Sequence, residues 1–120
     1  MWVYLVSSKR YVYIGEKESM ISVGNIKNGD TGEGIYRGVS VLGNPFTVKE
    51  YGRDKCIELY REWLRNEWKK SGKSKEELIR LAKLYKKEGV LNLVCYCAPL
   101  ACHGDVIAEA VRGIVDDGMV

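Results

Sequence analysis

The segment Val90–Cys97 constrains the fold of this chain more than any other part of its sequence. Apolar residues are nearly continuous across it, with Asn92 as the one interruption, and Gly89 and Pro99 stand at its two ends. A short apolar run with this punctuation is typical of a strand that is buried on both faces. It predicts a sheet whose last strand leads through a loop into a final helix.

The spacing of apolar residues predicts the other elements. Strands are expected at Trp2–Val6, Tyr11–Ile14, Met20–Ile26 and Ile35–Val41, with a turn at Asn28–Asp30. From about Arg53 the spacing becomes helical, and Gly72 interrupts it. A capping box of Ser74 and Glu77 is expected to begin a second helix, which ends at Gly89. A last helix is expected from Gly104 or Asp105 to Val115.

This order predicts the α/β class: a small sheet flanked by helices, with a Rossmann-like corner at the last strand–loop–helix unit. The 120 residues predict one domain. Residues 21–120 form the α/β domain, and residues 1–20 are an N-terminal strand or hairpin extension of it. Since no apolar run approaches the roughly 20 residues that span a bilayer, we expect a cytoplasmic protein that does not enter membranes.

The charges are unevenly distributed along the chain. Residues 49–87 carry thirteen Lys and Arg against seven Asp and Glu, whereas residues 88–120 carry one against five. A basic helical face could bind the phosphates of a nucleic acid, although an ordinary solvated helix surface with charge pairs of mixed sign is the favoured explanation. The chain has no Gln and only two Thr. This composition favours a heat-adapted source, and some proteins of hyperthermophiles keep disulfides inside the cell.

The segment Cys95–Asp105 gathers the residues that are best suited to chemistry. Four possible metal ligands, which include the one histidine of the chain, lie within nine residues: Cys95, Cys97, Cys102 and His103. Three cysteines and one histidine are a common ligand set for zinc. This ligand set makes zinc the expected cofactor. Because Cys102 and His103 are adjacent, a site of three ligands with an open position is as reasonable as a closed site of four.

The same residues allow two other readings. Without a metal, a thiol such as Cys102 could act as nucleophile with His103 as base, and Asp105 could orient the imidazole. Alternatively the cysteines are structural, as packed thiols or as a disulfide of Cys95 or Cys97 with Cys102. Asp105 could also simply cap the last helix, whose first amides, with that of Gly104, would offer an anion site. Cys56 is expected to be a small buried side chain on a helix.

Three stretches make the chain resemble domain-of-unknown-function family 4326, a group of small phage, bacterial and archaeal proteins. They are Val23–Lys27, then Ile35–Gly38 continuing into Gly43–Phe46, and finally Cys95–Leu100 with Cys102–Asp105. The resemblance implies that these residues matter, without giving an activity. Many relatives carry an arginine after the glycine at position 38, where this chain has Val39. Arg37 is the candidate to replace it.

Two functions are open. The first is a domain or hydrolytic enzyme that binds a nucleotide, a nucleoside or a nucleic-acid base. In that case Arg37, Gly43, Asn44, Phe46 and Gly104 would face one pocket with the Cys/His loop, so that Asn44 reads a base edge and Phe46 stacks. The second is an interaction module for nucleic acid or protein, in which a metal or a disulfide only holds the fold together.

Overall fold

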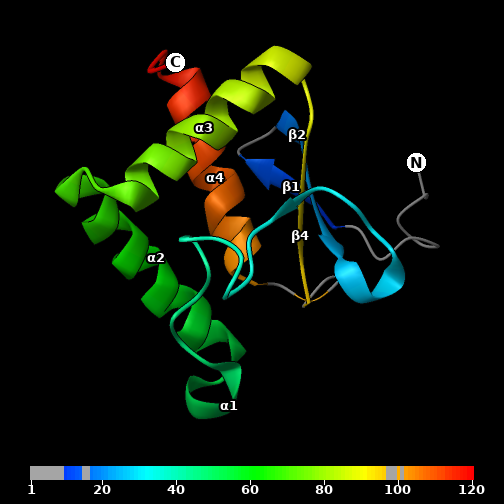
Figure 1. The fold of residues 1–120 in the computed structure, drawn as a ribbon, viewed down its shortest axis with the longest axis vertical. Coiled ribbons are helices and arrows are strands. Elements are labelled where there is room, and N and C mark those ends of the chain that lie inside the picture. The colour runs from blue at the N-terminus through cyan, green and yellow to red at the C-terminus, as the bar shows by residue number, and fades with distance from the viewer. Residues whose placement is uncertain (1–9, 15–16, 97–99, 101) are drawn as a thin grey trace.

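The computed structural model describes residues 10–14, 17–96, 100 and 102–120. Along these residues a group of strands is followed by a group of helices, then by one strand and a last helix (Figure 1). In chain order the elements are β1 (Arg10–Ile14), β2 (Lys17–Asn25), the 3₁₀ helix η2 (Ile26–Asn28), β3 (Glu33–Gly34), α1 (Val48–Tyr51), α2 (Arg53–Lys70), α3 (Lys73–Glu88), β4 (Leu91–Cys95) and α4 (His103–Asp116). This order confirms the α/β class.

The four described strands form one sheet in the order β1-β2-β4-β3. β1 pairs with β2 in antiparallel direction, whereas β2 and β3 both run parallel to β4. Asn25 and Cys95, the last residues of β2 and β4, are direct partners in the register. The carboxyl ends of the parallel strands therefore lie at one edge of the sheet, which is where open α/β sheets usually bind their ligands.

Helices cover one face of the sheet. Ile21 and Val23 of β2, together with Leu91 and Leu93 of β4, are buried in the same apolar cluster as the inner faces of the helices. The helical residues in this cluster are Tyr60 and Leu64 from α2, Leu78, Leu81, Ala82 and Tyr85 from α3, and Val106, Ile107, Ala108, Val111 and Ile114 from α4. These positions recur at three- and four-residue spacing, so each helix buries one stripe.

The connection between β2 and β3 crosses the other face of the sheet, over β4 (Figure 1). On this face Ser22 Oγ donates to Asn92 Oδ1 at 2.7 Å. Asp30 Oδ2 accepts from the amide of Asn25 at 2.8 Å and holds the connection close to β2. A Cβ atom at Gly24 would lie 2.8 Å from Cβ of Asp30, so this crossing requires glycine.

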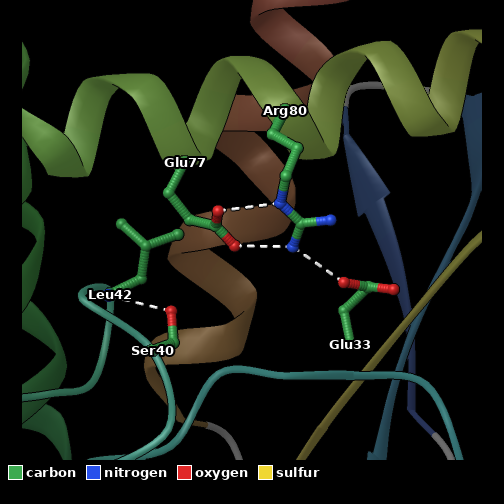
Figure 2. A network of polar contacts seen from close by, with 5 residues as sticks. All are labelled: Glu33, Ser40, Leu42, Glu77 and Arg80. Atoms are coloured by element: carbon green, nitrogen blue, oxygen red, sulfur yellow. Dashed lines mark hydrogen bonds and ion pairs between the residues drawn. The ribbon is translucent and has the colours of Figure 1, made fainter.

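A guanidinium on α3 fixes β3 to the helical layer (Figure 2). Arg80 Nη2 donates to Glu33 Oε1 at 2.7 Å and also to Glu77 Oε2 at 2.7 Å. Arg80 Nε donates to Glu77 Oε1 at 2.8 Å, so the Arg80–Glu77 pair is bidentate. In the same region Ser40 Oγ accepts from the amide of Leu42 at 3.0 Å. The two-residue strand β3 thus has a side-chain anchor as well as its backbone pairing.

Several predicted elements are confirmed. Strands occur at Arg10–Ile14, Lys17–Asn25 and Leu91–Cys95, and α2, α3 and α4 lie where the helical spacing placed them. Gly89 ends α3 in a left-handed conformation, with φ of 78°. β4 is buried at every position except Asn92, close to the expectation for a strand covered on both faces. The predicted strand Trp2–Val6 lies outside the described residues.

Three predictions of local structure are wrong. Ile35–Val41 forms a turn, because Gly38 adopts φ of 91° and the amides of Val39 and Ser40 both bond to the carbonyl of Tyr36. Ser74 does not begin α3: the N-cap is Gly72, and Ser74 Oγ instead bonds to Glu67 Oε1 on α2. Asp105 does not cap α4, since Cys102 occupies the N-cap position.

A search of the described residues finds no helix with the length and apolar character needed to cross a membrane.

The two glycines of α4 provide a matched test of the helix–sheet packing. A Cβ at Gly104 would lie 2.9 Å from Val23 Cγ1, whereas a Cβ at Gly113 meets no atom within 4 Å. We expect Gly104→Ala to lower the free energy of unfolding by about 1–3 kcal/mol through overpacking. Gly113→Ala should raise it by about 0.5–1 kcal/mol, because alanine is the better helix former. Urea denaturation of both variants measures this, and equal effects would contradict the close approach of α4 to β2.

Candidate functional site

Two buried side chains hold the segment between β3 and α1 against the helices. His103 Nε2 lies 2.7 Å from the carbonyl oxygen of Ile35, and Tyr60 Oη donates to the carbonyl of Leu42 at 2.6 Å. The two rings also contact each other edge-on, with their centroids 5.1 Å apart. Burial first, and the charge of Cys102 second, raise the pKa of Tyr60 above its usual value. Tyr60 therefore keeps its proton and remains a donor.

The loop Gly43–Phe46 is held by hydrogen bonds of the Arg37 and Asn44 side chains. Arg37 Nε and Nη2 donate to the carbonyl of Asn44 at 3.0 and 2.8 Å, and Nη2 reaches the carbonyl of Phe46 at 3.3 Å. Asn44 Oδ1 accepts from the amide of Phe46 at 2.9 Å, and Asn44 Nδ2 donates to Cys56 Sγ at 3.2 Å. Both ends of the Asn44 amide are thus used to build the loop and to attach it to α2.

Two thiols meet where β4 ends and α4 begins. Cys95 Sγ and Cys102 Sγ lie 3.4 Å apart, and both residues are buried. Cys102 is the N-cap of α4, and its sulfur accepts from the amide of Gly104 at 3.3 Å. The amide of Asp105 donates to the carbonyl of Cys102 at 3.0 Å. The amides of Gly104 and Asp105, which sequence offered as an anion site, are therefore engaged in the cap.

His103 follows directly after Cys102 and is itself buried. When the imidazole is neutral and Nε2–H donates to the carbonyl of Ile35, the lone pair of the ring lies on Nδ1. Any role of His103 as a base or a metal ligand then falls to Nδ1. In metal-ligating histidines, one ring nitrogen usually binds the metal while the other donates a hydrogen bond to a group such as a backbone carbonyl.

One cavity of about 250 Å³ joins this corner to the loop at Gly43–Phe46. Its wall combines aromatic rings, two guanidinium groups and three thiol-bearing residues. It is lined by Tyr36, Arg37, Asn44, Phe46, Thr47, Val48, Arg53, Cys56, Ile57, Cys95, Tyr96, Cys102 and His103. The cavity opens at the carboxyl ends of the parallel strands, where Tyr36 and Tyr96 pack edge-to-face with centroids 5.0 Å apart.

The structure brings most of the predicted site residues together. Those that line the cavity are Arg37, Asn44, Phe46, Cys95, Cys102 and His103. Gly43 and Gly104 lie behind the wall, where a Cβ would clash with the Arg37 backbone and with Val23. Asp105 is half-buried in the first turn of α4. Cys97 lies outside the described residues.

The sequence did not mark seven residues of the wall as site residues, among them Tyr36, Arg53, Cys56 and Tyr96. Tyr36 and Tyr96 stand beside Arg37 and Cys95 in the chain, so their positions next to predicted site residues were the available signal. Arg53 and Cys56 come from the start of α2, and only the packing of this helix against the loop shows that they belong to the site.

Within the described part of the chain, no group of three or more His, Cys, Asp or Glu side chains is arranged to hold a metal ion. The two sulfurs of Cys95 and Cys102 are close enough to share one. Thiolates bound to one tetrahedral zinc at about 2.3 Å would lie roughly 3.8 Å apart. The predicted zinc site would thus need a further ligand, and Cys97 is the sequence candidate.

The basic residues of the segment 49–87 lie on α1, α2 and α3. Several of them are used in ion pairs with acidic side chains: Arg61 with Glu109, Lys70 with Glu67, and Arg80 with Glu33 and Glu77. These pairs agree with a solvated surface of mixed sign, although they do not test nucleic-acid binding.

Comparison with known proteins identifies one relationship. A family model described as a domain of unknown function, DUF4326, matches residues 10–113 of the chain. No curated protein and no solved structure matches. The match covers every element of the fold from β1 through most of α4, and so includes the whole cavity wall.

The role of Asn44 can be tested by two substitutions. Asn44→Ala removes the acceptor for the Phe46 amide and the donor to Cys56, and should lower the free energy of unfolding by about 1–2 kcal/mol. Asn44→Asp keeps the acceptor and should cost less than half as much. Chemical denaturation compares them. An alanine variant as stable as the parent would show that Asn44 does not hold the loop.

Proposed function

The chain belongs to the DUF4326 family, and we propose that its cavity binds a nucleotide or a nucleoside. The observation that carries this proposal is the convergence of the loop Gly43–Phe46 and the Cys/His corner on one cavity. Each part comes from a separate segment of the chain, and they meet at the edge of the sheet that α/β proteins use for ligands.

The chemistry of the wall fits a planar ligand that carries negative charge. Tyr36, Phe46 and Tyr96 supply rings on which a base could stack. Arg37 and Arg53 supply guanidinium groups, whose planar donors match phosphate oxygens. Arg37 donates to the loop carbonyls through Nε and Nη2, and these contacts hold its guanidinium at the wall of the cavity.

The size of the cavity limits the part of the ligand that it encloses. At roughly 30 Å³ per water, 250 Å³ corresponds to about eight waters. This volume suits a base or a sugar-phosphate group, whereas a dinucleotide would extend into solvent. Asn44 is part of the wall in this proposal and does not read the base, because its amide is engaged with Phe46 and Cys56.

Cys102 is the residue best placed for covalent chemistry on such a ligand. Its sulfur lines the cavity, stands at the amino end of α4 and accepts a backbone amide. A helix amino terminus and a hydrogen bond both favour the thiolate, which is the nucleophilic form of cysteine. His103 follows it in the chain and lines the same cavity. The reaction class in this proposal is hydrolytic transfer to water, with Cys102 or a bound metal as the reactive centre.

Binding can be tested by thermal shift with AMP, CMP, GMP and UMP. A ligand at one hundred times its Kd stabilises the fold by about 2.7 kcal/mol and should raise the Tm by several degrees. Arg53→Gln, in the cavity wall, should weaken binding about tenfold, because it removes a charged donor. Arg65→Gln is the matched control, since Arg65 lies on the same helix outside the cavity. No shift with any of the four, or equal effects of both variants, would reject the proposal.

Zinc at the Cys/His corner stays a prediction, and Cys95 and Cys102 are the two described residues that would hold it. Elemental analysis of protein purified without chelator or affinity metal tests it directly. The prediction expects one zinc per chain, lost on Cys95→Ser and kept on Cys56→Ser. A negligible zinc content together with four titratable thiols in the denatured chain would exclude a resident metal.

A further inference from the structure

The contact between Cys95 and Cys102 lies inside the cavity wall. The two sulfurs are 3.4 Å apart, and the residues are only 1% and 4% exposed. Both residues line the cavity, and Cys102, the more exposed of the two, is the thiol that a small solute in the cavity meets first.

We propose that Cys95 and Cys102 are a site of reversible oxidation, at which a hydroperoxide that enters the cavity converts the two thiols to a disulfide. The bond removes both thiol groups from the wall of the cavity. The consequence for nucleotide binding rests on the proposed function, whereas formation of the bond does not.

The reaction balances with hydroperoxide as the only oxidant. Cys102 is the more exposed of the two, and its sulfur attacks one peroxide oxygen, which breaks the O–O bond and releases water, or an alcohol from an organic peroxide. Cys102 then carries a sulfenic acid. The sulfur of Cys95 attacks that sulfur, the S–S bond forms, and the sulfenic oxygen leaves as water with the second thiol proton. Two thiols have given two electrons and two protons to the peroxide.

Cys56 differs from Cys95 and Cys102 in what its sulfur contacts. It lines the same cavity and is 1% exposed, but its sulfur accepts from Asn44 Nδ2. Among the described cysteines, the sulfurs that contact each other are those of Cys95 and Cys102. An oxidised Cys102 therefore has a resolving thiol in contact, and an oxidised Cys56 has Asn44 beside it.

The bond would join two elements that both shape the cavity. Cys95 ends β4, and Cys102 caps α4 through the amide of Gly104. A disulfide shortens the separation of the two sulfurs and draws the end of β4 toward the start of α4. Because it closes a short loop, it also restricts the unfolded chain, so the oxidised protein should have the higher Tm. This gain separates formation of the disulfide from oxidative damage.

The experiment treats the purified full-length chain with hydrogen peroxide at low molar excess. Mass spectrometry under non-reducing conditions should show the loss of two hydrogens, and peptide mapping should place the bond between Cys95 and Cys102. Dithiothreitol should reverse it. Cys56→Ser should form the same bond, whereas Cys95→Ser should abolish it. The oxidised protein should bind nucleoside monophosphate at least tenfold more weakly and melt several degrees higher.

Other outcomes would contradict the oxidation site, its effect on binding, or the proposed function. No disulfide, or one that joins a different pair of cysteines, overturns the site. A Cys95–Cys102 disulfide that leaves the Kd of a nucleotide unchanged overturns the effect on binding. If the reduced protein binds no nucleotide, the proposed function fails, while the mass and the peptide map still decide whether the oxidation site exists.

Discussion

Two side-chain hydrogen bonds to backbone carbonyls hold the candidate site together. His103 binds the carbonyl of Ile35, and Tyr60 binds the carbonyl of Leu42. Between these two points the chain makes a turn instead of a strand, and a buried carbonyl left without a partner would cost about 1–3 kcal/mol. The two bonds therefore define where the turn lies. They place Arg37 and the loop Gly43–Phe46 opposite the thiols.

The same constraint explains why chemically reactive residue types have structural roles here. Tyr60 is buried with its pKa raised, and thus serves as a permanent donor. His103 uses Nε2 to hold the turn at the carbonyl of Ile35. Cys102 caps α4 while its sulfur lines the cavity. Each of these three side chains holds the fold of the site and also lies at or beside the cavity. Substitutions at these positions will therefore alter the fold of the site along with any activity.

Much of this architecture could be predicted from the sequence, because local periodicity determines it. The apolar run before Cys95 and the helical spacing from Ile57 to Trp68 identify β4 and α2 within a few residues. The segment Ile35–Val41 misled the same reasoning: its alternating apolar residues suggest a strand, but Val39 and Val41 are 59% and 48% exposed because Gly38 turns the chain. Nothing local to Ser74 shows that Glu67, one helix earlier, competes for its hydroxyl.

The sequence predicted part of the cavity wall, and it did not predict the contacts that those residues make. Motif spacing and the family resemblance selected Arg37, Asn44, Phe46 and the Cys/His segment, and the fold brings them to one cavity. The partner of Asn44 is Cys56 on α2, and no local pattern reveals such a contact.

The cavity is proposed as the ligand site, and backbone amide NMR of ¹⁵N-labelled protein during titration with nucleoside monophosphates tests this most directly. The largest shift changes should fall in residues 36–48, 53–57, 95–96 and 102–103; changes centred on the outer faces of α2 and α3, or none with any nucleotide, would contradict it.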